Sequence, residues 1–273
     1  MSAEAHPVVV PVTAPRGWRR LATLGAQTGT FALVEVQKLR RDRTEVLTRM
    51  IQPALWLLIF GQTFSHLRVI DTGDVSYLSF LAPGIIAQSA LFIAIFYGIQ
   101  IVWDGDAGIL AKLMVTPAPT AALVSGKAFA GGIRSATQVI GVLAIAYLMR
   151  IPLTVNPLRI LAAMAVVVLG TLFFSCLSMT LAGLLRNRDR VMGIGQAITM
   201  PLFFASNALY PVDIMPTWLQ HLSAVNPLSY QVNALRGLLL GTPANLWVDV
   251  GVLLVAAVAG IAAAAAVIRR LVR

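Results

Sequence analysis

Six long apolar stretches constrain this chain more than any other feature of its sequence. Each holds the roughly 20 mostly apolar residues that a helix needs to cross a membrane. They fall approximately at residues 46–64, 77–103, 123–149, 158–185, 191–209 and 246–268. Hydrophobic residues make up 58% of the chain and charged residues only 12%, which is about half the charged share of soluble domains. We therefore expect an all-α integral membrane protein with six transmembrane helices.

The basic residues divide unevenly between the connections, although the formal net charge is +10. Most Lys and Arg side chains lie before the first stretch, around the second connection, at 186–190 and at 269–273. The connections on the opposite side carry only Arg68, Arg150, Arg159 and Arg236. Because positive residues remain on the cytoplasmic side, both termini are predicted to be cytoplasmic. The same placement argues against a nucleic-acid partner, whose basic residues would share a solvated face.

The N-terminal part divides into residues 1–18, expected to be a disordered tail, and residues 19–45, expected to be an amphipathic helix. In the second part, polar residues recur at spacings of 3 and 4, and Leu33, Val36 and Leu39 occupy another side. This pattern favours a helix lying on the membrane surface, with a solvated linker helix as the alternative. Its candidate functional residues are Glu35, Lys38 and Arg41.

A short amphipathic segment, residues 104–117, separates the second and third apolar stretches. Asp104 or Asp106 can cap the start of a helix, and Pro117 cannot lie inside one. One side of the expected helix carries Ile109, Leu110, Leu113 and Met114. A short helix with an exposed apolar stripe suits a groove in a soluble partner, so we predict a docking site for an external motor. A helix that only lies on lipid is the alternative.

Residues 211–240 predict a re-entrant helical hairpin on the face opposite the termini. Pro216 suits the start of one short helix, Asn226 and Pro227 suit the start of a second, and Gly241 suits its end. The second helix is too short to span a bilayer. Such a hairpin must pack against protein or line a cavity.

The motifs of several chemistries are missing from the sequence. Gly126 and Lys127 are followed by Ala128 and lack the earlier glycine of a phosphate-binding loop. No His, Cys or carboxylate spacing suits a metal. We expect no catalytic residue and no bound metal. Acidic residues are nearly absent from the stretches, which argues against an ion-driven carrier.

Neutral polar residues within the stretches either form hydrogen bonds between helices or line a path for an amphiphile. Arg134 either extends toward the membrane surface or belongs to such a path or a subunit interface. The candidate path residues are Gln88, Gln100, Arg134 and Asn207.

Four motifs, in order, carry a resemblance to a known family. They are Phe80-Leu-Ala-Pro-Gly84, Gly108-Ile-Leu-Ala-Lys-Leu-Met-Val-Thr-Pro117, Tyr210-Pro-Val-Asp-Ile-Met-Pro-Thr-Trp-Leu219, and Asn226-Pro-Leu-Ser-Tyr230 followed by Ala234-Leu-Arg-Gly237. With them the chain, from about Glu35 to its C-terminus, resembles type-2 ABC transporter permeases of the daunorubicin-resistance and nodulation lipo-oligosaccharide exporter kind.

The resemblance implies a six-span permease domain over residues 46–273, a coupling helix at 105–116 and an extracellular hairpin at 211–240. By resemblance, the residues that contact the ATPase are Asp106, Ile109, Leu110, Lys112 and Leu113. It implies a homodimer, or a heterodimer with a second permease, bound to two copies of a separate ABC ATPase subunit. ATP and Mg²⁺ would bind that partner, so this chain would be no enzyme and would hold no cofactor.

The implied function is outward movement of a hydrophobic drug or lipid-like amphiphile across the bacterial plasma membrane. A glycolipid or polysaccharide exporter remains open, because both branches share the motifs. A different class, an ATP-independent carrier or a membrane scaffold, also remains open, and it would not need the coupling helix.

Overall fold

The structure is a computed structural model that describes residues 43–67, 75–106, 120–185 and 187–268, with the single positions 29, 37, 70, 72, 73 and 108. Throughout these ranges the regular structure is helical. The predicted tail, the side chains of Glu35, Lys38 and Arg41, and residues 109–116 of the predicted coupling helix lie outside the described residues.

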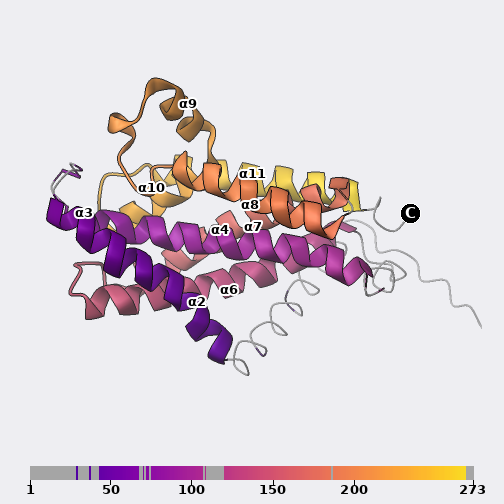
Figure 1. Cartoon of the computed structure of the whole chain (residues 1–273), viewed down its shortest axis with the longest axis horizontal. Helices are drawn as coiled ribbons and strands as arrows, with labels where there is room; N and C mark the ends of the chain where they lie inside the picture. Colours follow the sequence, from indigo (N-terminus) through magenta and orange to yellow (C-terminus); the bar gives the residue numbers. More distant parts are fainter. Residues whose placement is uncertain are drawn as a thin grey trace, which may run out of the picture.

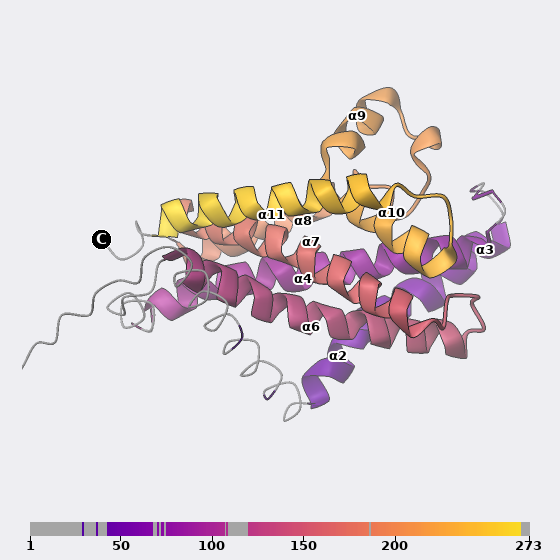
Figure 2. The ribbon, with the colours of Figure 1, turned by 180° about the vertical axis from the view of Figure 1, so that it is seen from behind.

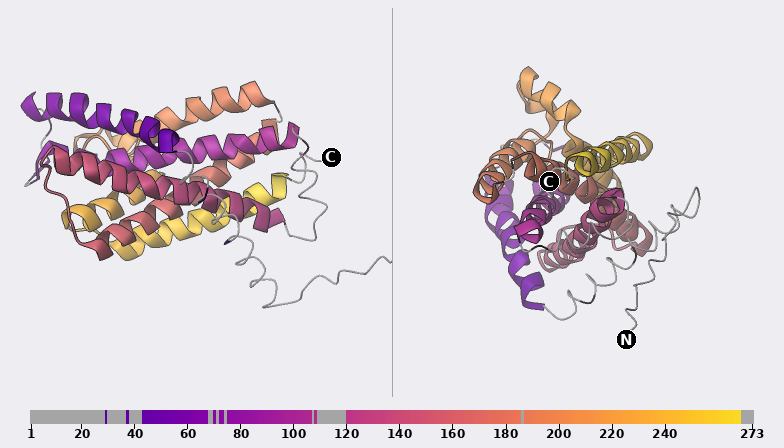
Figure 3. Two further views of the ribbon diagram at one scale, coloured as in Figure 1. Left: turned by 90° about the horizontal axis from the view of Figure 1, so that it is seen from below. Right: turned by 90° about the vertical axis from the view of Figure 1, so that its right-hand side faces the viewer.

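Four long helices form the bundle shown in Figure 1. They are α4 (Tyr77–Asp106), α6 (Thr120–Leu148), α7 (Pro157–Leu185) and α11 (Leu246–Ile268), and each is long and apolar enough to cross a membrane. This confirms four of the six predicted spans. Helix α4 is the central one, because 83% of its most apolar 18-residue stretch is buried, whereas only 28% of the corresponding stretch of α11 is. Seen along the bundle, α4 lies among the others (Figure 3, right).

Helices also occupy the other two predicted ranges, but neither alone has the length and composition of a span. The first range contains α2 (Arg43–Leu55), the π-helix η1 (Trp56–Gly61) and α3 (Gln62–Leu67) in direct succession. Pro53 lies inside α2 and removes a backbone donor just before the wider π turns. The second range contains α8 (Arg188–Phe204), which has 17 residues.

The predicted helix boundaries between residues 216 and 241 are confirmed. Helix α9 (Thr217–Val225) follows Pro216 and the short 3₁₀ helix η2 (Val212–Ile214), and α10 (Pro227–Leu240) follows Asn226. The Asn226 carboxamide accepts the Leu228 N–H at 3.0 Å, and Gly241 ends α10 with a left-handed φ of 75°.

The two short helices differ in their surroundings. Helix α10 packs against α7, α11 and α4 inside the bundle. Helix α9 projects from it (Figures 1 and 2), and its Trp218 is 67% exposed. Packing inside the bundle is therefore a property of α10, and α9 contacts mainly η2.

The bundle has two ends that later sections refer to. We call the end where α4 ends and α6 begins the α4–α6 end; α7 and α11 also end there, and α8 begins there (Figure 2). We call the other end, where α6 passes into α7, the α6–α7 end. Helices α3 and α10 end at the α6–α7 end, and α11 begins there (Figure 3, left).

Glycines let α4 approach its neighbours closely. A Cβ atom at Gly84 would overlap the carbonyl group of Ala208, and one at Gly98 would overlap the Ser178 side chain. At the second site the Ser178 hydroxyl donates to the Ile95 carbonyl oxygen at 2.8 Å. Small residues serve this purpose between membrane helices, where apolar surface gains little from leaving lipid.

Gly84→Ala is expected to destabilise the fold by about 1–3 kcal/mol, because the added methyl group meets backbone rather than a movable side chain. The matched control is Gly193→Ala in α8, where nothing lies within 4 Å of the added atom. That change should be neutral or stabilising by up to about 1 kcal/mol through helix propensity. Thermal denaturation in detergent, followed by size-exclusion recovery, compares the two. Equal behaviour would contradict the close contact at Gly84.

Candidate functional site: the two ends of helix α4

At the α4–α6 end, an ion pair joins the last turn of α4 to the first turns of α6. The Lys127 ammonium group donates to a carboxylate oxygen of Asp104, and both side chains are partly buried. Helix α4 continues through Asp106, whose side chain is exposed. Asp104 and Asp106 therefore lie in the last turn of α4, and the helix start that the sequence predicts after them lies outside the described residues. The pair fixes the two helix ends that flank residues 107–119.

Two arginines lie over aromatic rings in the same half of the bundle. The Arg134 guanidinium lies 5.3 Å from the centroid of Tyr97, and that of Arg49 lies 5.7 Å from Phe96. Arg134 is only 9% exposed, so its charge lies inside the bundle. The face of an aromatic ring stabilises a cation that has lost its water shell. The contact between Arg134 and Tyr97 therefore joins α6 to α4.

Near the α6–α7 end, the chain leaves helical geometry after α8 and remains irregular through Tyr210, although the segment is largely buried. A helix end leaves its last carbonyl groups without intrahelical donors, and buried carbonyl groups are costly when unpaired. Side chains supply these donors. The Asn226 carboxamide donates to Leu202 O at 2.7 Å and to Ala205 O at 3.3 Å, and the Ser206 hydroxyl donates to Phe203 O at 2.7 Å.

Two tyrosines complete the pairing of these carbonyl groups. The Tyr210 hydroxyl donates to Phe204 O at 2.5 Å, and the Tyr77 hydroxyl of α4 donates to Leu209 O at 3.1 Å. The irregular segment 205–210 is thus held by donors from α4, from the start of α10 and from its own turn.

Arg236 of α10 is the strongest of these donors. Its Nη2 donates to Asn207 O at 2.6 Å and to Ala208 O at 3.4 Å, and its Nε donates to Phe80 O at 3.3 Å. The guanidinium also lies 3.5 Å from the Phe80 ring centroid. Among the described residues no carboxylate pairs with it. One buried cation therefore joins α10, α4 and the segment after α8.

A row of aromatic rings continues from this arginine into the first helical segment. The rings of Phe80, Tyr77, Phe64, Phe60 and Trp56 follow one another with centroid distances of 4.3–6.5 Å. Trp56 in turn contacts Phe203 of α8 at 5.8 Å. The row packs η1 and α3 onto α4 and α8 at the α6–α7 end.

The structure does not gather the predicted path residues at one point. Gln88 and Gln100 both lie on α4, twelve residues and thus roughly 18 Å apart. Gln88 is buried and its Nε2 has no hydrogen-bond partner in the described part of the chain. Asn207 donates to the Asn233 side chain at 2.5 Å, which gives it a structural role between the α8 end and α10. Arg134 lies on α6, as described above.

Sequence reasoning missed two of these residues as functional candidates. Arg236 was assigned to an outer connection, yet it is a lone charge in the otherwise uncharged helix α10, which is itself a signal of a special role. From the sequence, Lys127 is considered only as one of the basic residues around the second connection and in a phosphate-binding pattern that fails. Of the predicted ATPase contacts, Asp106 alone is described, and Ile109, Leu110, Lys112 and Leu113 lie outside the described residues.

Arg236→Met is expected to cost about 3 kcal/mol and to lower Tm by roughly 5–10 °C, because three buried carbonyl groups lose a charged donor. Arg236→Lys should recover part of the loss, since an ammonium group reaches fewer of the carbonyl groups. Arg190→Met, at an exposed position of α8, is the matched control. A Tm for Arg236→Met equal to that of the control would contradict the bonding role of the guanidinium.

Comparison with known proteins agrees with this architecture. The model of the ABC-2 type transporter family matches residues 26–240. The chain is 30% identical over 213 residues to the ycf38 transport permease of Porphyra purpurea, covering 77% of this chain and 72% of that protein. It is 25% identical over 252 residues to the daunorubicin resistance ABC transporter permease DrrB1 of Streptomyces coeruleorubidus, covering 92% and 88%. It is 26% identical over 228 residues to nodulation protein J of Rhizobium leguminosarum bv. viciae, covering 82% and 86%.

These matches confirm the family that the sequence motifs indicated. The family model covers the central helix α4, the irregular segment after α8 and the whole of α10. Permeases of this family work with an ATP-binding subunit. The chain belongs to the ABC-2 type transporter family, as a membrane-spanning permease subunit.

Proposed function

We propose that this permease moves a hydrophobic drug or a lipid-like amphiphile outward across the bacterial plasma membrane, using a separate ABC ATPase subunit. The described spans are mainly apolar, and their buried polar groups, such as Gln88, Gln138 and Asn207, are mostly neutral. Such an interior suits an uncharged amphiphile. The relative DrrB1 is named for resistance to the drug daunorubicin, and this name supports a drug-like substrate here.

We propose six spans in all. The segment from Arg43 to Leu67 is helical for roughly 37 Å, which exceeds the thickness of a hydrocarbon core. Its Ile51 and Ile59 side chains are 57% and 62% exposed, as expected for a surface facing lipid or a second permease. Helix α8 forms the fifth span together with segment 205–210. Helix α10 is the inserted part of a re-entrant hairpin over residues 211–240.

We propose that the α4–α6 end faces the cytoplasm. The charges of Lys127 and Arg190 lie at this end, whereas Arg150 and Arg159 lie at the other. Positive residues favour the cytoplasmic side, so both termini would be cytoplasmic and α9 would project outside the cell. Residues 19–45, with Glu35, Lys38 and Arg41, would lie along the inner membrane surface.

The Asp104–Lys127 ion pair is the observation that best supports coupling to an ATPase. It ties the two helices that flank the predicted coupling helix at 105–116. A displacement of that helix would then move α4 and α6 as one unit, and α4 reaches the Arg236 contacts at the opposite end of the bundle. Two ATPase copies, holding ATP and Mg²⁺, would act on a homodimer or a heterodimer of permeases through Asp106, Ile109, Leu110, Lys112 and Leu113.

Replacing Leu110 and Leu113 by Asp is expected to abolish co-purification of the ATPase subunit, because an apolar stripe would no longer fill a groove. The control is Trp218→Asp with Leu222→Asp, which makes the same change on exposed apolar residues of α9. ATP hydrolysis and substrate export are then measured in vesicles whose proton gradient has been collapsed. Export that stops when the gradient is collapsed, although ATP and the ATPase subunit are present, would instead assign the chain to an ATP-independent carrier.

The ion pair is tested by charge reversal. Asp104→Lys and Lys127→Asp are each expected to lower ATP-driven export several-fold while the ATPase subunit stays bound, because like charges separate the helix ends. The double variant restores opposite charges and should recover most of the export. Additive losses in the double variant would contradict mechanical coupling through this pair.

A further inference from the structure

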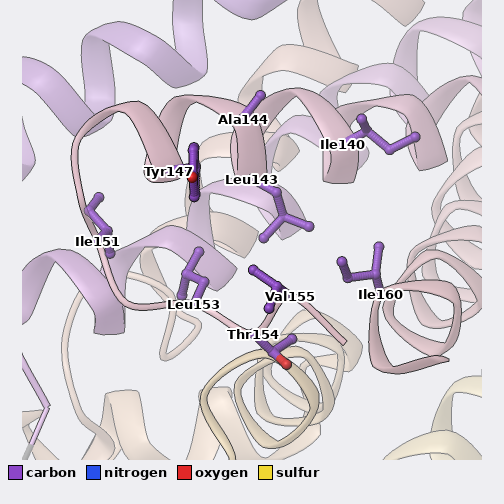
Figure 4. A pocket seen from close by; sticks show the side chains of 9 residues that line it. All are labelled: Ile140, Leu143, Ala144, Tyr147, Ile151, Leu153, Thr154, Val155 and Ile160. Carbon is purple, nitrogen blue, oxygen red and sulfur yellow. The ribbon is translucent and has the colours of Figure 1, made fainter. Parts of the chain in front are cut away.

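An apolar pocket of about 350 Å³ lies at the α6–α7 end, and nothing described so far uses it. The lining side chains in Figure 4 come from the end of α6, from the connection to α7 and from the start of α7, and Leu143, Leu153, Val155 and Ile160 surround a common space. The lining includes Ile140, Leu143, Tyr147, Leu153, Val155 and Ile160. Its volume falls within the range of roughly 300–1,000 Å³ that is common for ligand sites.

The apolar surface around the pocket continues onto the outside of the bundle. Ile140, Leu148 and Leu158 are 54%, 81% and 73% exposed, at the ends of two helices able to cross a membrane. Tyr147 is 76% exposed beside them. Tyrosine at the end of a spanning helix is typical of the level where acyl chains meet head groups. The pocket therefore opens at the membrane depth where a lipid's acyl chain joins its head group.

Two arginines flank the pocket in the sequence, next to lining residues. Arg150 precedes Ile151 and Arg159 precedes Ile160, and both are exposed. Among the described residues neither pairs with a carboxylate. Arginine beside a membrane interface is suited to a phosphate, which it binds with two parallel donors.

Arg150 also has an uncommon backbone conformation, with a φ of 57°. Its N–H donates to Tyr147 O at 3.0 Å and the next N–H, of Ile151, donates to Ala146 O at 2.9 Å, which is the turn that usually has glycine at this position. An L-residue is strained there. Among the described residues the Arg150 guanidinium has no hydrogen bond or ion pair, so its charge is available to a ligand at the membrane surface.

We propose that this pocket holds one acyl chain of an anionic phospholipid, whose head-group phosphate is bound by Arg150, with Arg159 as the second cation. The Thr154 N–H donates to Leu239 O at 2.9 Å, so the connection lining the pocket is tied directly to the end of α10. A bound lipid braces this connection and stabilises the packed position of α10. The proposal needs only a membrane location and does not depend on the transported substrate.

The test uses the full chain in detergent, depleted of lipid, with phosphatidylglycerol added back. Native mass spectrometry counts retained lipid, and Tm reports its effect, since a ligand of the folded state raises Tm. We expect one retained lipid and a rise in Tm. Ala144→Phe fills the pocket and should abolish both, whereas Ala259→Phe, at an exposed position of α11, should leave both unchanged.

The head-group contact is tested at Arg150. Arg150→Gln keeps the strained turn but removes the charge, and it should weaken binding about fivefold, while Arg150→Lys should retain most of the affinity. Glycerol phosphate, which lacks acyl chains, should give no shift in Tm.

Three results would overturn the proposal. The first is an equal shift for Ala144→Phe and wild type, which would place the lipid elsewhere. The second is an equal shift with glycerol phosphate, which would indicate an anion site alone. The third is that Ala144→Phe alters the oligomeric state but still retains the lipid, which would assign the pocket to a second copy of the chain.

Discussion

The buried, irregular backbone after α8 is the constraint on which the rest of this bundle depends. A helix that ends inside an apolar environment exposes carbonyl groups that neither water nor lipid can satisfy. Here three donors from two parts of the chain, Tyr77 of α4 with Asn226, which caps α10, and Arg236 of α10, reach carbonyl groups of residues 202–209. Because every donor must be in place, the positions of α4, α8 and α10 are fixed relative to one another.

Helix α4 connects this constraint to the opposite end of the bundle. Its Phe80 carbonyl and ring contact Arg236, whereas its Asp104 pairs with Lys127 about 36 Å along the helix axis. Close glycine contacts at Gly84 and Gly98 prevent α4 from sliding freely past its neighbours. A permease that receives force at one end and changes its interior at the other needs a rigid element of this kind.

The sequence predicted helix boundaries well where local chemistry determines them. Asn226, Pro227 and Gly241 delimit α10 as expected, because a cap, a first-turn proline and a left-handed glycine act within a few residues. The end of the second span was placed at residue 103, three residues early, because Asp104 and Asp106 resembled the start of a new helix. The helix continues because the charge of Asp104 is met by Lys127, 23 residues away.

The sequence by itself determined that this is a helical membrane protein, where its long apolar helices lie, and to which family it belongs, since apolar length, loop charge and short motifs are local properties. Only the tertiary structure decided that α4 is central, that α10 enters the bundle while α9 projects, and that Arg236 is a buried donor rather than a loop cation. The reason is distance along the chain: Arg236 and Phe80 are 156 residues apart, and only the packed bundle brings a donor and an acceptor so separated into contact.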